Sequence, residues 1–420
     1  MTTATVAEPR TGDARIIAQL WLVLLAAIIS LFPFTIYSTF LVPISQTAQV
    51  SEALAGALRG LGGIAALVTG VLIAPWLQRW SLQKASAAAL LALAIASGFL
   101  TQGSQAALIV FCAGIGAATA LLTPSLLTTA TAQFPNPASS ARAATIVTSV
   151  QTLAAVMCAP LIGGMALVMG WQATMWVVAA LALLAAGRFW FTASDQPQPP
   201  SQRLGYLEAF RSMASRIDLL ALIGIAFART AAFMGFLSFL AIHFHRSFGL
   251  DATTITLVWT LSGLSFFVGN FLAGRWAAHQ AEGSQRQAWL IGGGLVTATV
   301  AVVAVYSFDQ MFIALGATSI VGFSHAVVAA GVTTLIAHRS GQAKPMAFSL
   351  NAAAMSLGVF AGAGLGGVGL ALAGTAGLAA TFAALTALGF LGLLVYVRVA
   401  ETSSPLLASR PDQPDGPQRH

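Results

Sequence analysis

Twelve long apolar stretches, separated by short polar gaps, fill most of the chain. They lack the strict alternation of barrel strands, which favours helices. About 20 apolar residues in a helix cross a bilayer core of about 30 Å, where every backbone polar group needs a partner within the protein. We therefore predict an all-α membrane protein with twelve transmembrane helices. The predicted spans are 18–44, 52–76, 84–103, 106–132, 141–168, 172–192, 218–243, 252–277, 286–306, 310–336, 345–372 and 376–399.

Composition supports a membrane protein. The 420 residues are 57% hydrophobic and only 7% charged, whereas soluble proteins average about 25% charged residues. Residues 1–17 are polar and lack the pattern of a cleavable signal peptide, so we expect a cytoplasmic N-terminal segment. Residues 400–420 are rich in Pro, Asp and Ser, and we expect a disordered cytoplasmic tail.

The basic residues define the orientation. All of the 19 Lys and Arg residues except Arg59, Arg229 and Arg246 fall in alternate gaps between the spans or in the terminal segments. Cytoplasmic loops of membrane proteins carry this excess of positive charge. We therefore expect both termini in the cytoplasm, and the basic charge needs no nucleic-acid partner. The absence of N-glycosylation sequons favours a bacterial inner membrane.

A polar linker at 194–217 divides the spans into two sets of six. Within it, Leu204, Leu207, Phe210 and Met213 alternate with charged residues, which predicts an amphipathic helix on the cytoplasmic interface. The expected domains are an N-terminal bundle at 18–193 and a C-terminal bundle at 218–399.

The two halves resemble each other. Residues 141–164 and 343–367 both begin with a small residue and a base, and both end in a ladder of small residues that closes on Gly-Gly. The GIGAA segment at 114–118 has GFSHA at 322–326 as its counterpart. Parallel repeats of six helices are a transporter architecture whose binding site lies at the repeat interface, near the membrane midplane.

At this point the chain resembles the major facilitator superfamily over essentially its full length. The loop after the second span is similar to the family pattern Gly, Pro, Asp-Arg-x-Gly-Arg-Lys. The matching residues are Gly70, Pro75, Arg79 and Lys84, whereas Gln78, Ser81 and Gln83 depart from the pattern. In the second copy of this loop, only Gly269 and Gly274-Arg275 remain.

The fifth span resembles the signature of the drug:proton antiporter group, which are efflux proteins. The matching residues are Ala155, Ala159, Pro160, Gly163 and Gly164. Small residues allow close helix approach, and Pro160 weakens the helix hydrogen bonds locally. The resemblance implies export and a conformational gating role for both motifs. Generic tight packing is the alternative explanation of the small residues.

Two departures bear on proton coupling. The antiporter group usually has an Arg four residues before the position of Gly114, where this chain has Val110. Many members also carry an acid in the first span, and residues 30–37 hold none.

Two ionisable side chains lie near the middle of their spans. Ionisable residues at this depth are costly and by default indicate function. Arg229 has no deep acid to pair with, and its fork of donors suits carboxylate or phosphate. His325 is the residue at this depth that titrates near neutral pH in water, which suits it to carry a proton or bond a ligand. The alternatives are bonds from Arg229 to backbone carbonyls and a neutral His325 bonded to a neighbouring Ser or carbonyl.

For the other candidates for substrate binding or coupling, a structural role is the favoured explanation. Arg59 follows Glu52 by two helical turns, so snorkelling to the outer interface or pairing with Glu52 is its favoured role. We expect Glu52 and Asp251 to cap the helices that they begin. Polar and aromatic residues within the spans complete the set, with helix packing as their alternative role. They are Tyr37, Gln151, Asn270, Asn351, Phe233 and Phe236.

Several functions are disfavoured. Cys112 and Cys158 lie inside spans without metal or redox spacing, and no phosphate-binding Gly-x-x-x-x-Gly-Lys run exists. We therefore expect no cofactor, no metal site, no obligate protein partner and no enzymatic activity.

The chain is thus predicted to be a secondary active transporter that works by alternating access, with protons as the candidate coupling ion and without direct use of ATP. Export of a small amphiphilic drug or metabolite is the first hypothesis, with anionic or neutral compounds favoured because of Arg229. Import or exchange of an organic or inorganic anion is the first alternative. A membrane receptor or scaffold without transport activity is the second.

Overall fold

The computed structural model describes residues 12–70, 80–134, 136–192, 215–278 and 284–403. Within these ranges, nine helices are long and apolar enough to cross a membrane, or ten if a pair bent by 109° counts as one span. That pair joins α4 (Leu41–Thr47) to α5 (Glu52–Leu58) and α6 (Leu61–Val68). The two further predicted spans lie within two long helices that each contain a break.

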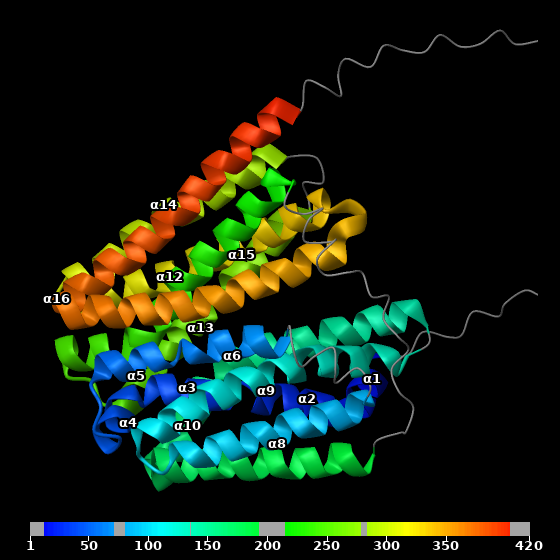
Figure 1. The fold of residues 1–420 in the computed structure, drawn as a ribbon, viewed down its shortest axis with the longest axis vertical. Coiled ribbons are helices and arrows are strands. Elements are labelled where there is room, and N and C mark those ends of the chain that lie inside the picture. The colour runs from blue at the N-terminus through cyan, green and yellow to red at the C-terminus, as the bar shows by residue number, and fades with distance from the viewer. Residues whose placement is uncertain (1–11, 71–79, 135, 193–214, 279–283, 404–420) are drawn as a thin grey trace, which may run out of the picture.

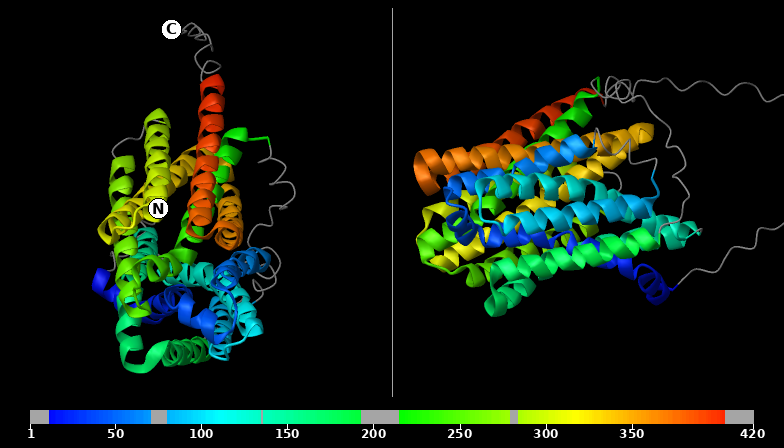
Figure 2. Two further views of the ribbon diagram at one scale, coloured as in Figure 1. Left: turned by 90° about the vertical axis from the view of Figure 1, so that its left-hand side faces the viewer. Right: turned by 60° about the horizontal axis from the view of Figure 1, so that its bottom comes forward.

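Helices α10 (Pro137–Phe191) and α16 (Lys344–Ser403) each reverse direction within one continuous assignment (Figures 1 and 2). Gly170 breaks α10 at φ 78° and ψ 163°. Gly374 breaks α16 at φ 60° and ψ −140°. Glycine adopts these backbone angles without a steric penalty from a Cβ atom. Each helix therefore makes two crossings, which accounts for the predicted twelve spans with breaks between 168 and 172 and between 372 and 376.

The first span is not one continuous helix as predicted. It is divided into α1 (Asp13–Gln19), α2 (Trp21–Ile29), α3 (Phe32–Thr39) and α4. Two of the breaks have a clear cause, because Pro33 and Pro43 have no N–H to donate to the carbonyls of Ile29 and Thr39. The helix consequently ends just after each of these carbonyls, at Ser30 and at Phe40.

The other helices each form one crossing. They are α8 (Leu82–Leu100), α9 (Gln105–Ala132), α12 (Ile217–Phe248), α13 (Ala252–Ala278), α14 (Ser284–Ser307) and α15 (Met311–Arg339), with the short 3₁₀ helix η2 (Gly341–Ala343) after α15. Figure 1 shows α1–α10 in the lower half of the view and α12–α16 above them. The two halves are the expected six-helix bundles. The predicted amphipathic linker helix and the C-terminal tail lie outside the described residues, apart from their ends.

Alternating helix directions bring the basic helix ends to one side, which we call the basic face. It carries Lys84, Arg142, Arg188, Arg216, Arg286, Arg339, Lys344 and Arg398. The turns at Gly170, Gly249 and Gly374 lie on the other side, which we call the opposite face.

Two ion pairs order helix starts on the basic face. Arg142 donates to Asp13 at 2.8 Å and, through its second nitrogen, to the other carboxylate oxygen. These hydrogen bonds lower the pKa of Asp13. Arg216 donates twice to Asp218 at 3.0 Å and once to the carbonyl of Arg339 at 2.9 Å.

Backbones approach closely at corresponding places in the two bundles. In the N-terminal bundle, Gly116 on α9 lies directly against Gly62 on α6. In the C-terminal bundle, a Cβ atom on Gly322 of α15 would lie 2.9 Å from the carbonyl oxygen of Ser262 on α13. Both contacts join the second and fourth spans of their bundle, so the sequence repeat is also a repeat of packing.

The contact at Gly116 makes a prediction about stability. A side chain there collides with the Gly62 backbone, so we expect Gly116→Val to lower the free energy of unfolding by about 1–3 kcal/mol, as overpacked cores do. Thermal unfolding in detergent measures the effect. Gly187→Val is the matched control, because a Cβ atom at Gly187 meets no atom within 4 Å. Equal unfolding midpoints for the two variants contradict the role of this contact.

Candidate functional site

The two bundles meet along two interfaces related by the repeat. In one, the first half of α10 packs against α13, and in the other, the first half of α16 packs against α5 and α6. These are the fifth span with the eighth, and the eleventh with the second. A rotation of one bundle against the other must slide along both interfaces.

The antiporter-like residues of the fifth span lie at the first interface. A Cβ atom on Gly163 would lie 2.5 Å from the hydroxyl oxygen of Thr256, and a Cβ atom on Gly263 would lie 3.5 Å from the carbonyl oxygen of Ala155. Ala159 is buried and Pro160 is half-buried within the helix, whereas Gly164 faces open space. Small residues here let α10 and α13 approach to backbone contact. Their gating role stays a prediction.

Glycines also make the second interface. On α6, Gly63 lies against the carbonyl oxygen of Ser356. At the junction of α5 and α6, a Cβ atom on Gly60 would lie 2.9 Å from the carbonyl oxygen of Phe360. Nearer the opposite face, Gly56 lies against the ring of Phe239 on α12. The bundles are therefore in close contact in the half of the molecule toward the opposite face.

Polar links reinforce this closure. Arg59, at the end of α5, donates to the carbonyl of Met234 at 3.1 Å and to the hydroxyl of Ser238 at 2.9 Å, both on α12. Its guanidinium also lies 5.7 Å from the ring centre of Phe34. Glu52 and Arg246 form an ion pair across the same boundary at 2.7 Å. We call these contacts the outer link.

The expected roles of Arg59 and Glu52 are therefore wrong. Glu52 pairs with Arg246 of the other bundle, and Arg59 donates to Met234 and Ser238 of α12, so both side chains are committed across the boundary between the bundles. The cap of α5 is Ser51, whose hydroxyl accepts from the amide of Leu54 at 3.2 Å. The capping role of Asp251 is confirmed, since its carboxylate accepts from the amides of Thr253 and Thr254 at 3.1 and 3.4 Å.

Arg229 and His325 come together inside the C-terminal bundle. Arg229 is 3% exposed, and its Nη2 donates to the hydroxyl of Thr230 at 2.9 Å. Its Nη1 and both ring nitrogens of His325 have no hydrogen-bond partner among the described residues. The ring of Phe233 lies 5.2 Å from the His325 ring and 5.2 Å from the Phe266 ring, stacked on the latter. We call these residues the Arg229 site.

The electrostatics of this site favour an anion. His325 lies near Arg229, because its ring is 5.2 Å from that of Phe233, which follows Arg229 by about one turn of α12. Helices α12, α13 and α15 contain a single acid, Asp218, which lies at the start of α12 and is paired with Arg216. Buried donors without partners cost about 1–3 kcal/mol each, and an acceptor from a bound solute removes that cost.

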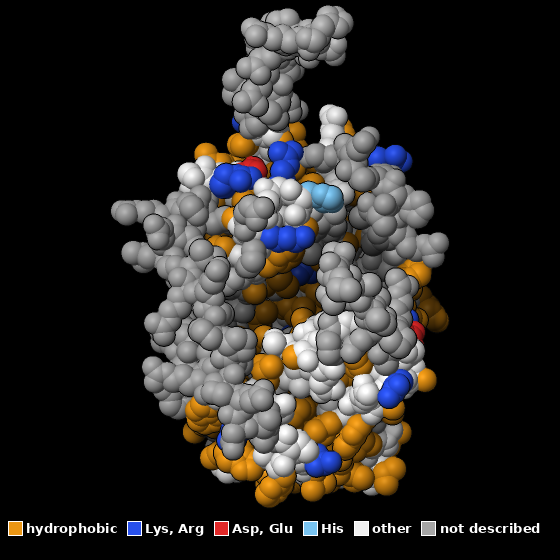
Figure 3. All heavy atoms as spheres, turned by 90° about the vertical axis from the view of Figure 1, so that its right-hand side faces the viewer, with side chains coloured by type: hydrophobic (Ala, Val, Ile, Leu, Met, Phe, Trp, Pro, Cys, Tyr) orange, Lys and Arg blue, Asp and Glu red, His pale blue; other side chains and the backbone are white. Residues whose placement is uncertain are grey.

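The molecule is hollowed between the bundles on the basic face. Figure 3 shows this opening, with basic side chains around the rim and mainly apolar side chains inside. Helix α12 contacts both bundles. Ile217, Leu220 and Gly224 are exposed and Phe227 and Met234 half-buried, at a spacing that puts all five on one face of α12. The carbonyl of Met234 accepts from Arg59 of the N-terminal bundle, so this apolar stripe of α12 is the face turned toward that bundle.

The other predicted residues lie apart from the Arg229 site. Tyr37 is fully buried and donates to the carbonyl of Ala55 at 2.6 Å. Phe236 is fully buried against Tyr306 and Phe382. Asn351, 8% exposed, donates to the sulfur of Met355 at 3.5 Å. Gln151 and Asn270 are half-buried.

The structure describes only part of the predicted gating loop. Pro75 and Arg79 lie outside the described residues, as does the side chain of Arg275. Gly70 follows the end of α6, and Lys84 lies in the first turn of α8. Ser81, which departs from the family pattern, caps α8 by accepting from the amide of Lys84 at 3.4 Å.

Sequence reasoning missed Ser238, Thr230 and Phe266. Ser238 could have been noticed as a hydroxyl within an apolar span, but only the fold places it opposite Arg59. Phe266 gave no signal, because aromatic residues are common in apolar spans.

Comparisons with known proteins agree with this geometry. The family model of the Major Facilitator Superfamily matches residues 23–344 and 222–418. A bacterial homologue of the human lysosomal transporter Spinster has a similar fold in two crystal structures, both inward-facing. The occupied form has a TM-score of 0.72 and the unoccupied form 0.73, each at 18% identity over 94% of this chain and 99% of the other. A variant of the nucleoside transporter NupG has a TM-score of 0.69 at 14% identity, over 90% of this chain and 99% of the other. No curated protein sequence matches the chain.

The chain is therefore a membrane-embedded, non-enzymatic transporter, and the predicted fold class is confirmed. It belongs to the major facilitator superfamily.

The outer link makes a prediction about the conformational equilibrium. Hydrogen bonds from a charged group contribute about 1.5–3 kcal/mol, so we expect Arg59→Leu to raise the population open at the opposite face about tenfold or more. Ala363→Cys is the reporter, because Ala363 is fully buried at the second interface. Its rate of modification by a thiol reagent measures the opening, in a background with Cys112 and Cys158 replaced by Ala.

Arg246→Gln is the comparison variant. Arg246 is 49% exposed, and half-exposed ion pairs contribute about 1 kcal/mol or less, so a smaller rise is expected. An unchanged modification rate in Arg59→Leu shows that the outer link does not hold the opposite face closed.

Proposed function

We propose that this protein exports a small amphiphilic solute, anionic or neutral, from the cytoplasm by alternating access. The observation that carries the proposal is Arg229, whose Nη1 is buried without a partner among the described residues. A guanidinium binds carboxylate or phosphate oxygens through two parallel hydrogen bonds, which suits an anionic end group. The apolar stripe of α12 suits the rest of an amphiphilic molecule.

The proposed orientation places the basic face in the cytoplasm of a bacterial cell, with the protein in the inner membrane and both termini inside. The collection of basic helix ends on one face supports this orientation through the positive-inside rule. The opening between the bundles then faces the cytoplasm. The antiporter-like residues at the interface of α10 and α13 support export.

In the proposed cycle, solute enters from the basic face and binds at the Arg229 site. Closure of the opening and rupture of the outer link then expose the site at the opposite face. His325 is the proposed proton carrier, because it is the titratable side chain beside Arg229. Protonation of His325 places a second positive charge next to Arg229. Proton binding and anion binding at this site are therefore coupled, and the direction of proton movement relative to the solute distinguishes symport from antiport.

A second candidate function is anion exchange without protons. The single acid of α12, α13 and α15, Asp218, is paired with Arg216 at the basic face, so these helices hold no free carboxylate to carry a proton near Arg229, which favours exchange. The direction of flux and its coupling distinguish the two functions.

Transport in proteoliposomes tests the proposal. Vesicles that hold the protein are filled with a pH-sensitive dye. Solutes are then added in pairs, each an aromatic carboxylate and its neutral amide, and cationic amines are added as a third class. We expect Arg229→Gln to reduce carboxylate flux about tenfold or more, because a charge-assisted bond is lost, while amide flux is retained. Arg229→Lys keeps the charge but loses the fork, so an intermediate flux is expected.

The same vesicles test coupling. We expect solute-dependent proton flux in the native protein and its loss in His325→Gln. Solute flux without proton movement in the native protein favours exchange instead. Undiminished flux of every transported carboxylate in Arg229→Gln contradicts the proposed anion site.

A further inference from the structure

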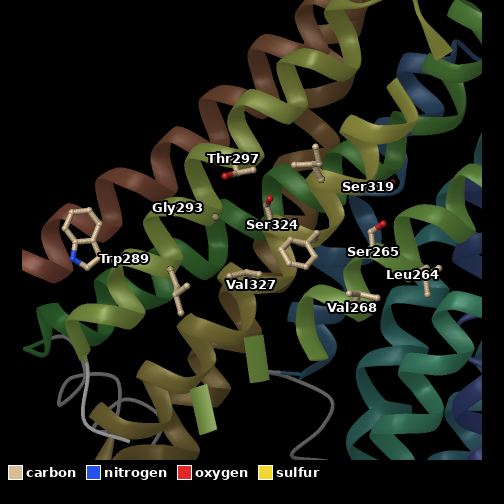
Figure 4. A pocket seen from close by; sticks show the side chains of 13 residues that line it. Leu264, Ser265, Val268, Trp289, Gly293, Thr297, Ser319, Ser324 and Val327 are labelled. Carbon is tan, nitrogen blue, oxygen red and sulfur yellow. The ribbon is translucent and has the colours of Figure 1, made fainter. Parts of the chain in front are cut away.

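A second binding feature lies on the outer surface of the C-terminal bundle, away from the Arg229 site. Helices α13, α14 and α15 enclose a groove of about 710 Å³ (Figure 4). Helix α14 packs against α15 and α16, at the periphery of its bundle. The groove is therefore on the side of the protein that meets lipid. Its walls include Leu264, Val268, Trp289, Ile320 and Phe323.

The groove suits hydrocarbon rather than a polar solute. Four residues with hydroxyls line it, Ser265, Thr297, Ser319 and Ser324. The hydroxyls of Ser265 and Ser319 donate within their own helices, to the carbonyls of Leu261 at 2.8 Å and Leu315 at 3.0 Å. The donors of these two residues are thus already used. Gly293 widens the groove, since a Cβ atom there meets no atom within 4 Å.

A tryptophan and a basic side chain lie at the end of the groove toward the basic face. Trp289 is 76% exposed, and tryptophan favours the boundary between hydrocarbon and headgroups. Arg286 precedes Trp289 by three residues and Gly293 by seven, so it lies on the same face of α14, one turn beyond the groove. Arg286 is exposed, and α13, α14 and α15 contain no Asp or Glu.

We propose that this groove binds one acyl chain of an anionic phospholipid, with the phosphate of its headgroup held by Arg286. Basic residues at the cytoplasmic end of a groove between membrane helices recognise such headgroups. The apolar groove takes the chain, Trp289 lies at the level of the ester groups, and the guanidinium supplies the charge. The occupant is a lipid of the leaflet at the basic face.

Native mass spectrometry of the intact protein tests this proposal. The protein is equilibrated in detergent with equal amounts of phosphatidylglycerol and phosphatidylcholine, and the lipids retained are counted. We expect the native protein to retain phosphatidylglycerol with about a fivefold preference, the factor expected from one arginine at an anionic headgroup. Arg286→Gln should retain both lipids equally.

Two glycine variants test the place of binding. Gly293→Leu fills the groove without a clash and should remove the preferential retention of phosphatidylglycerol. Gly316→Leu is the matched control, because Gly316 on α15 also meets open space but does not line the groove, and it should bind as the native protein does. Equal retention of the two lipids by the native protein, or an unchanged preference in Arg286→Gln or Gly293→Leu, overturns the proposal. Neither outcome depends on whether the protein transports anions.

Discussion

The arrangement of this transporter depends on helix backbones that touch at glycine. In a bilayer, lipid tails are as apolar as the side chains, so helices associate through close packing and hydrogen bonds rather than through the hydrophobic effect. Gly116 against Gly62 holds two spans of one bundle together, and Gly63 against Ser356 holds the two bundles together. Because the contacts between bundles lie toward the opposite face, the bundles separate toward the basic face (Figures 1 and 3). The outer link of Arg59 adds directional bonds to the same closure.

Arg229 lies inside the C-terminal bundle, apart from this closure. The side chain is buried at membrane depth beside His325, in helices whose single acid, Asp218, is committed to Arg216 at the basic face. A charge in this position is costly, and its unsatisfied Nη1 adds to the cost. Under the proposed function, binding of an anion that arrives through the opening recovers this cost. Packing and charge then have separate proposed roles, in which glycines form the interfaces between the bundles and Arg229 selects the solute.

Sequence patterns predicted much of this fold, because span length and loop charge follow directly from the thickness and polarity of a bilayer. They also singled out Gly163, which lies at an interface between the bundles, and Arg229, which is buried, since a glycine ladder and a deep charge stand out in apolar spans; their roles stay predictions. They did not predict the breaks of the first span, although Pro33 and Pro43 were visible, because membrane helices often tolerate proline. They also assigned Arg59 to Glu52, since two turns of one helix are predictable from spacing, whereas its bonds to Met234 and Ser238 arise from the meeting of two bundles. Contacts within a helix can be read from sequence, and contacts between bundles cannot.

The most direct test of the account is equilibrium binding to the purified protein, measured as the shift of its thermal unfolding midpoint. A ligand that binds the folded state raises this midpoint, and at equal concentration a tighter ligand raises it more. Aromatic carboxylates and their isosteric amides are compared on the native protein and on Arg229→Gln. The account predicts that carboxylates raise the midpoint of the native protein more than their amides do, and that this difference disappears in Arg229→Gln. Equal shifts for carboxylate and amide in the native protein, or a difference that survives in Arg229→Gln, contradict Arg229 as the group that selects the solute.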